Sequence, residues 1–175
     1  MPDSTPSEPS SLPHRIAVLC YLYDTDGRIL MLHRAKPPNQ DLYSPVGGKL
    51  ETELGECPWA CARREIEEET GLHISAEDIR MFGMISETAY EGSGHWLLYL
   101  FEVTRPIEPD ELAFTEFDEG QLEWIPQEKV MDLKIPETDR RVIWPMVCKH
   151  RGGFFGVHID CRTDPFTWSV VQESS

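Results

Sequence analysis

The sequence predicts an α/β fold of the α+β type, in which a mixed β-sheet is covered by helices. Apolar, β-branched runs separated by Gly-containing turns indicate hairpins within residues 15–34 and 79–105. Helical patterns lie at residues 58–70 and 136–150. Because hairpins occur on both sides of a helix, without strict alternation of strand and helix, we expect a mixed sheet rather than a purely parallel one.

The expected elements follow the chain from one turn signal to the next. Strands at 15–23 and 29–34 flank an Asp-Gly turn, which is typical of a hairpin, and the Pro- and Asn-rich residues 35–45 are expected to form a surface loop. The later elements are strands at 79–90, 95–105 and 122–125, a helical turn at 126–133 and a terminal hairpin at 154–159 and 166–171. Residues 136–150 are expected to be helical through Trp144, with Pro145 as a kink or as an N-terminal position of a further turn.

The helix at 58–70 has clear end signals. Pro58 suits the first helical position and Gly71 suits the position just past the end, whereas Cys57 stands where a stronger capping side chain is usual. Apolar residues recur at three- and four-residue intervals and predict one buried stripe, formed by Trp59, Ala62 and Ile66.

Length and composition indicate one globular domain. The 175 residues suffice for a single core, which we assign to residues 14–175. The Pro-, Ser- and acid-rich residues 1–13 are expected to form a disordered tail without the features of a signal peptide. No apolar run is long enough to span a membrane, and five scattered cysteines without CxxC spacing indicate reduced thiols in a cytoplasmic protein.

The charge restricts the partners. The formal net charge is -15, from 31 acidic and 16 basic residues, so the chain repels phosphate polymers and is not expected to bind a nucleic-acid polymer. A small nucleotide can still bind if divalent cations screen its phosphates from the carboxylates. The sequence carries no clear mark of subunit exchange, and a homodimer is compatible with it.

Acidic side chains gather on one face of the helix at 58–70. Glu65, Glu68 and Glu69 are three or four residues apart, and Glu56 approaches the same helix from the preceding loop. A run of glutamates is usually a solvated helix face. Here a Gly-Gly pair at 47–48 precedes it and allows close approach of the backbone to a ligand, which favours a site for a hard divalent cation.

The run REIEEETGL at residues 64–72 resembles the second half of the Nudix box, the signature of the MutT-type hydrolases. Glu56, eight residues before Arg64, also matches that signature. Seven residues separate Gly48 from Glu56 where the family has five, so the loop KLETELG carries a two-residue insertion. The order of expected strands resembles the family over most of residues 14–160.

This resemblance implies an α/β/α sandwich with a mixed central sheet, and a Mg²⁺-dependent enzyme, with Mn²⁺ as a substitute, that cleaves a nucleoside diphosphate derivative by attack of water on phosphorus. It implies Glu68 and Glu69 as metal ligands, assisted by Glu56 and the Gly47 carbonyl. Glu65 would orient the cluster or act as a base, and Arg64 would clamp a glutamate. Glu119, in the segment before the strand at 122–125, matches the acid that the family supplies from outside the box.

Among the branches of the family, the chain most resembles the 8-oxo-dGTP diphosphatases, which convert oxidised purine nucleoside triphosphates to monophosphates. Arg34 matches a basic residue for phosphate, and Gly48 would let the backbone approach the substrate. Ser44 stands where an Asn reads the purine, and Glu137 and Asp139 fall near the pair of acids that reads the oxidised base.

Other interpretations stay open. Tyr90, eighteen residues beyond Leu72, is compatible with a dinucleoside polyphosphate hydrolase, whereas the proline typical of ADP-ribose hydrolases is absent after the box. A nucleotide sensor without turnover would be expected to lack box acids that this chain keeps. A prenyl diphosphate isomerase would need a catalytic cysteine near the box, but capping and packing explain Cys57 and Cys61 better.

Overall fold

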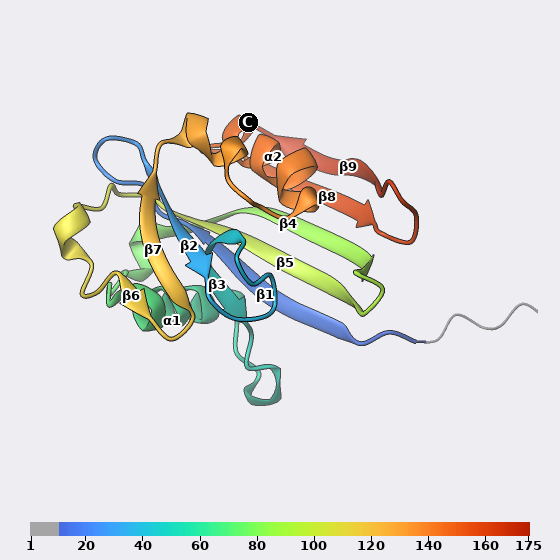
Figure 1. Cartoon of the computed structure of the whole chain (residues 1–175), viewed down its shortest axis with the longest axis horizontal. Helices are drawn as coiled ribbons and strands as arrows, with labels where there is room; N and C mark the ends of the chain where they lie inside the picture. The colour runs from blue at the N-terminus through green and yellow to red at the C-terminus, as the bar shows by residue number, and fades with distance from the viewer. Residues whose placement is uncertain (1–10) are drawn as a thin grey trace, which may run out of the picture.

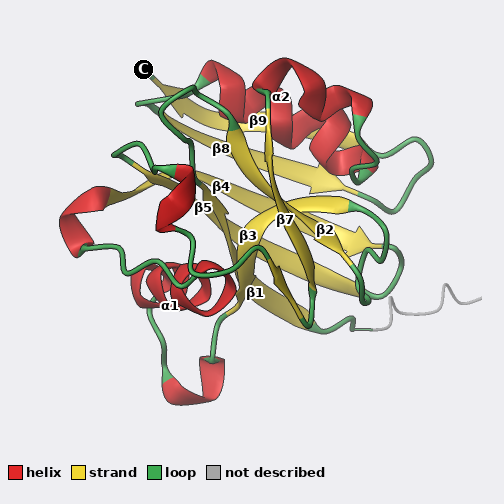
Figure 2. Ribbon diagram, turned by 60° about the vertical axis from the view of Figure 1, so that its left-hand side comes forward, coloured by secondary structure: helices red, strands yellow, loops and turns green. Residues whose placement is uncertain are grey.

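The computed structural model describes residues 11–175 and has a nine-stranded mixed sheet in the order β6-β7-β2-β3-β1-β5-β4-β8-β9. Helices cover both faces of the sheet, as Figures 1 and 2 show. The mixed sheet between helices is the predicted fold class. The strands are β1 His14–Tyr21, β2 Ile29–Arg34, β3 Tyr43–Lys49, β4 Ile79–Tyr90, β5 Gly94–Val103, β6 Glu116–Phe117, β7 Gly120–Ile125, β8 Phe154–Asp160 and β9 Thr167–Ser174.

The helical elements are two α-helices and several short turns. They are α1 Pro58–Thr70, α2 Trp144–Lys149, the 3₁₀ turns η1 Thr52–Leu54, η2 Ala76–Asp78, η3 Pro109–Glu111 and η4 Gln127–Asp132, and the π-helical turn η5 Asp139–Ile143. The expected helix at 136–150 is therefore a π-helical turn that continues into α2. The expected tail at residues 1–13 lies largely outside the described residues. No described helix is long and apolar enough to cross a membrane.

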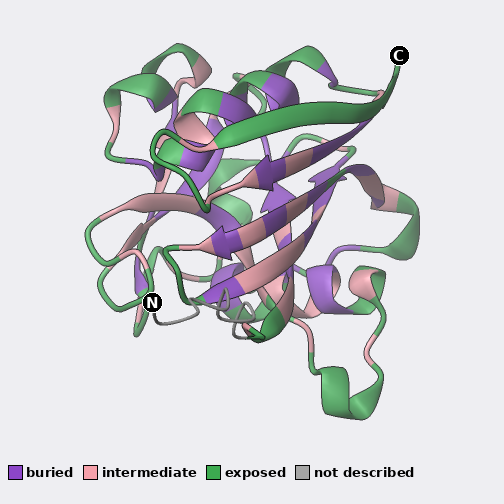
Figure 3. Ribbon diagram, turned by 90° about the vertical axis from the view of Figure 1, so that its right-hand side faces the viewer, coloured by how far each residue is buried: buried purple, intermediate pink, exposed green. Residues whose placement is uncertain are grey.

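Alternating side chains of β1 divide the core between the two faces of the sheet. Val18 and Cys20 pack with α1 on one face, while Ala17 and Tyr21 pack with η5 and α2 on the other. Figure 3 shows the buried inner strands and the edge strand β9, which is exposed along its whole length. The sheet thus separates two cores, each closed by one helical layer.

The first predicted hairpin is wrong beyond its turn. Asp24 holds the turn tightly, accepting hydrogen bonds from the Asp26 and Arg28 backbone N–H groups. Beyond it, β3 lies between β1 and β2 and pairs antiparallel with both. The hydrogen bonds of the turn are local and determine only that the chain reverses direction. Strand β3, which begins at Tyr43 inside the expected loop, forms the backbone hydrogen bonds with β1 and β2 that the hairpin was expected to form between them.

Helix α1 has the predicted bounds, but its buried stripe differs from the prediction. Cys57 is the N-cap, with its sulfur 3.5 Å from the Ala60 nitrogen, and Gly71 adopts a φ of 76° and closes the helix on the Glu67 carbonyl. Ala62 and Ile66 are fully buried, whereas Trp59 is 47% exposed and packs against Phe101 with the two rings in a T-shaped arrangement.

Replacement of Ile66 by Ala should lower the free energy of unfolding by about 2–5 kcal/mol, because it leaves a cavity between α1 and the sheet. Urea denaturation followed by circular dichroism measures this loss. Glu67→Ala, on the exposed side of the same helix, is the control and should change stability by less than about 1 kcal/mol. Equal effects of the two substitutions would contradict this packing of α1.

Candidate active site

A pocket of about 480 Å³ opens between the sheet, the loop after β2 and the η5 turn. Its floor is formed by β1 and β5, where Ala17, Leu19 and Leu98 supply an apolar surface. One end reaches α1 and the Gly-Gly pair of β3, and the other reaches β4 and η5. The predicted site residues that line it are Arg34, Ser44, Gly47, Gly48, Arg64, Glu65, Glu119 and Asp139.

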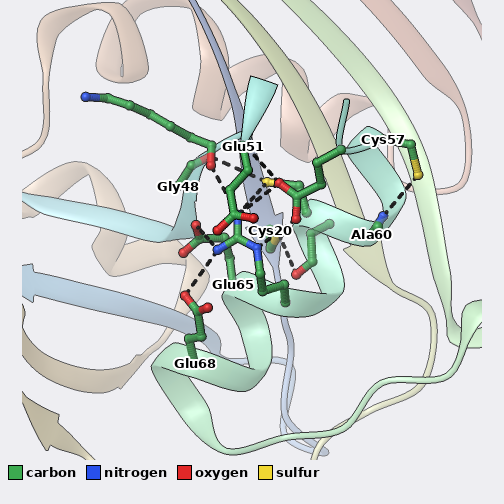
Figure 4. Close-up of polar contacts among 12 residues, drawn as sticks. Cys20, Gly48, Glu51, Cys57, Ala60, Glu65 and Glu68 are labelled. Atoms are coloured by element: carbon green, nitrogen blue, oxygen red, sulfur yellow. Dashed lines mark hydrogen bonds and ion pairs between the residues drawn. The ribbon is translucent and has the colours of Figure 1, made fainter. Parts of the chain in front are cut away.

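At the α1 end, Arg64 contacts three carboxylates from two segments of the chain. Its Nε lies 2.7 Å from Glu56 Oε1, and its Nη1 lies 3.0 Å from Glu65 Oε1 and 3.2 Å from Glu68 Oε2. Its Nη2 also donates to the Lys49 carbonyl at 3.2 Å. Figure 4 shows Gly48, Glu65 and Glu68 gathered at this point of the helix. This is the geometry of the clamp that the sequence predicts for Arg64.

Glu56 is the most strongly held of these acids. The hydrogen bonds of Arg64 lower the pKa of Glu56 to about 2. Its Oε2 also accepts from the Glu51 backbone N–H at 2.9 Å, which closes the loop that carries the two-residue insertion. The extra residues form η1, which projects away from the body of the molecule in Figures 1 and 2. The insertion is thus accommodated outside the pocket, and Glu56 keeps its place beside Arg64.

Glu69 lies in a different environment from Glu56. It is only 3% exposed, and its Oε2 accepts a hydrogen bond from the Gly47 backbone N–H at 3.1 Å. Burial, together with the nearby carboxyls of Glu65 and Glu119, raises the pKa of Glu69 to about 9. Burial also raises the pKa of Glu65. The cluster therefore has more buried carboxyl groups than Arg64 alone can neutralise.

The Gly-Gly pair permits this close packing. A Cβ atom on Gly48 would lie 2.3 Å from Glu65 Oε1, and a Cβ on Gly47 would lie 2.1 Å from the Val18 carbonyl oxygen. Both distances are shorter than any van der Waals contact. At Gly47 the obstacle is backbone, so only glycine lets β3 approach β1 in this way, whereas a side chain at position 48 would displace the Glu65 carboxyl.

The donor set fits a hard divalent cation, because all of its groups are oxygens and the buried Glu69 has no cationic partner among the described residues. Besides burial, the Glu119 carboxyl raises the pKa of both Glu65 and Glu69, while Glu68 is 57% exposed at the rim. Within residues 11–175, no three acidic, His or Cys side chains converge closely enough to form a finished metal site. A cation would therefore have to draw the carboxylates together.

The other end of the pocket also contains carboxyl groups. Asp139 begins η5, and burial raises its pKa to about 7. Glu137 is 68% exposed, is 3.4 Å from Arg140 and is not among the residues that line the pocket. The hydroxyl oxygen of Ser44 is buried at the pocket wall and has no hydrogen-bond partner within the described residues.

Glu87 of β4 lines the pocket and was not predicted from the sequence. It is 5% exposed, and burial raises its pKa to about 8. The sequence contains a signal for this residue. Alternate residues of β4 point to the buried face of the sheet, and Glu87 lies on that face between Ile85 and Ala89. A carboxyl at an inward position of a strand is a strong indication of a polar pocket.

Cationic and aromatic groups flank the mouth of the pocket. The Arg15 guanidinium carbon lies 5.5 Å and the Lys49 ammonium 5.9 Å from the centre of the Trp96 ring, which also lines the pocket. Arg34 lies at the pocket on the opposite loop, where its Nε donates to the Pro38 carbonyl at 2.7 Å. These groups provide positive charge and a flat ring at the pocket.

The family model described as the NUDIX domain matches residues 13–144. This range contains the Arg64 cluster and the Gly-Gly pair, so the chain belongs to the NUDIX domain family. Protein 111R of Invertebrate iridescent virus 3 is 24% identical over 91 residues, a match that covers 52% of this chain and 50% of the viral protein.

Two solved structures show the same fold. A MutT protein from Bacillus halodurans superposes with a TM-score of 0.68 at 23% identity, covering 91% of this chain and 96% of that protein. The NUDIX domain of Shewanella oneidensis NrtR, complexed with ADP ribose, superposes with a TM-score of 0.62 at 13% identity and covers 84% of this chain and 93% of that domain. At these identities the likeness concerns the fold, and the activity of this chain must be argued from its own residues.

Glu56→Gln should destabilise the metal-free protein at neutral pH by about 1–2 kcal/mol, because it removes the charge paired with Arg64. The pKa of Glu56 is lowered in the folded state, so its contribution is present above the ordinary pKa of a glutamate and is lost as the pH falls towards about 2. Urea denaturation at pH 7 and pH 3 should show the difference between variant and wild type shrinking in acid. A difference that is independent of pH would contradict the ion pair.

Proposed function

We propose that the protein is a Mg²⁺-dependent hydrolase that cleaves the pyrophosphate linkage of a nucleoside triphosphate. The products would be a nucleoside monophosphate and inorganic diphosphate. The preferred substrate is proposed to be an oxidised purine nucleotide such as 8-oxo-dGTP. The proposal depends on the carboxylate cluster that Arg64 holds at one end of the pocket. The rest of the pocket has an apolar floor and polar side chains on its walls. Membership of the NUDIX domain family supports it.

The residues of the cluster are proposed to have different roles, according to their positions. Glu68, Glu69, Glu56 and the Gly47 carbonyl would hold the cation, which when bound would neutralise phosphate charge and increase the acidity of water. Glu65 and Glu119 line the pocket, which supports a role for one of them in taking a proton from the attacking water. Arg64 orients the carboxylates, and Arg34 and Lys49 lie where the phosphates of a bound nucleotide would need positive charge.

The remaining pocket has the character of a base site. Gly48 allows close approach of the substrate to β3, and the free Ser44 hydroxyl and the Asp139 carboxyl provide hydrogen-bonding groups above an apolar floor. The two ends of the pocket match the two ends of a nucleotide, which has charged phosphates at one end and a flat ring with polar edge atoms at the other.

A second candidate is hydrolysis of another nucleoside diphosphate derivative, such as a dinucleoside polyphosphate or ADP-ribose. Tyr90 lines the pocket and favours it, because a tyrosine there can contact a second nucleoside. A sensor without turnover is less well supported, since all the acids of the box are present. The small-molecule partner, a cytoplasmic location and a single domain over residues 14–175 are part of the proposal.

Glu69→Gln should reduce the rate of Mg²⁺-dependent hydrolysis of 8-oxo-dGTP by at least about a hundredfold, and Glu68→Gln should also reduce it strongly, since each removes a proposed ligand. Release of diphosphate measures the rate, and excess chelator should abolish it. Glu67→Gln, an exposed acid on the same helix, is the matched control and should retain activity. Full activity of both ligand variants, or activity in chelator, would exclude the mechanism.

Asp139→Asn should change the ratio of kcat/KM for 8-oxo-dGTP and dGTP by about tenfold, because an amide offers a different donor and acceptor pattern from a carboxyl. A panel that also contains ADP-ribose and diadenosine polyphosphates identifies the substrate class. An unchanged ratio would remove Asp139 from base recognition, and a strong preference for a dinucleotide would favour the second candidate.

A further inference from the structure

Glu87 is a buried carboxyl group that the proposed chemistry does not use. It projects from the middle of β4 into the end of the pocket remote from α1. Only 5% of its surface is exposed, although it sits among the apolar positions of its strand. Burial of a carboxyl costs free energy unless its oxygens are hydrogen-bonded, so we expect the Glu87 carboxyl to have a hydrogen-bond donor as its partner.

The protein itself supplies little to satisfy this carboxyl. The Thr138 side chain contributes one hydrogen bond, and the neighbouring Asp139 carboxyl carries charge of the same sign. Among residues 11–175, Glu87 forms no ion pair with Arg, Lys or His, whereas the other buried acid of this sheet region, Glu102, pairs with both Arg80 and Arg151. Glu87 therefore keeps acceptor capacity that faces the pocket.

The surroundings of Glu87 suit a flat heterocycle. Trp96 stands directly opposite Glu87 in the β4–β5 register, so both side chains lie on the same face of the sheet. Ala17 and Leu98 form the adjoining floor, and the unpartnered Ser44 hydroxyl lies in the same pocket. A flat base can stack on an aromatic ring and an apolar floor, and a fixed carboxyl can form hydrogen bonds with the polar atoms along its edge.

We propose that Glu87 determines which base the pocket accepts, by accepting hydrogen bonds from two adjacent N–H donors on the edge of a purine. The ring N–H and exocyclic amino group of guanine, and of its 8-oxo form, present such a pair, whereas adenine presents an acceptor beside an amino group. This inference rests on the proposed function only in taking the pocket as the base site. It names the substrate class as purine nucleotides with a guanine-type edge.

A glutamine at this position would reverse the pattern at one of the two atoms. Burial raises the pKa of Glu87 to about 8, so the free carboxyl is partly protonated at neutral pH, and two N–H donors of a bound base would favour its ionised form. That carboxylate offers two acceptors, whereas an amide of nearly the same shape offers one acceptor and one donor. The amide donor would face an N–H of guanine, but it would match the ring nitrogen of adenine. Glu87→Gln thus changes the recognition chemistry with little change in volume.

Equilibrium binding of guanosine, inosine and adenosine to the metal-free protein, followed by calorimetry, tests the proposal without phosphate or metal. Wild type should bind guanosine at least about tenfold more tightly than either of the others, because inosine lacks the amino group and adenosine lacks the ring N–H. Glu87→Gln should reduce the guanosine-to-adenosine ratio of affinities by about tenfold or more and remove the advantage over inosine.

Glu102→Gln is the matched control, since it neutralises an equally buried acid outside the pocket. It is expected to lower stability and to leave the ratio of affinities unchanged. An unchanged ratio in Glu87→Gln, a parallel loss of affinity for all three nucleosides, or similar affinities of wild type for guanosine and inosine would overturn the proposal. The inosine comparison needs no variant and holds even if Glu87→Gln fails to fold.

The two proposals can fail separately. Selective nucleoside binding that depends on Glu87, in a protein that hydrolyses no nucleotide with Mg²⁺, would support the base site and reject the proposed reaction. Hydrolysis without any preference among the nucleosides would retain the reaction and reject the role of Glu87.

Discussion

Crowding of like charges at the end of α1 is the constraint on which the site depends. Arg64 neutralises part of the charge of Glu56, Glu65 and Glu68, but it makes no hydrogen bond to the buried Glu69. Burial and the neighbouring carboxyls of Glu65 and Glu119 raise the pKa of Glu69, so its ionised form is disfavoured in the folded protein. We propose that a divalent cation bound here supplies the further positive charge that makes the arrangement favourable.

The sheet makes this crowding possible. β3 inserts between β1 and β2, and its two glycines bring the backbone against both β1 and the carboxyl of Glu65. The Gly47 N–H is thereby directed at Glu69 from across the sheet. β1 also supplies Ala17 and Leu19 to the floor of the pocket, so this strand contacts both the glycine pair and the proposed base site. The long KLETELG loop carries its extra residues outward as η1 and leaves this geometry intact.

Local chemistry could be predicted from the sequence, and long-range packing could not. Pro58 and Gly71 fix the ends of α1, and the spacing of its acids places them on one face, because these effects depend only on neighbouring residues. Trp59 was expected to be buried and is half exposed, since a helical period does not show how far the sheet extends beneath it. Glu87 was missed although its strand was predicted, because its role arises from contact with η5, about fifty residues later in the chain.

The central claim is that the carboxylates at the end of α1 form a cation site that is completed by the metal. Titration of the chelator-treated protein with Mn²⁺, followed by electron paramagnetic resonance, tests it directly and without any substrate. We expect saturable binding that Glu69→Gln weakens by at least about tenfold and that Glu102→Gln leaves unchanged. Absence of saturable binding, or equal affinity in wild type and Glu69→Gln, would contradict it.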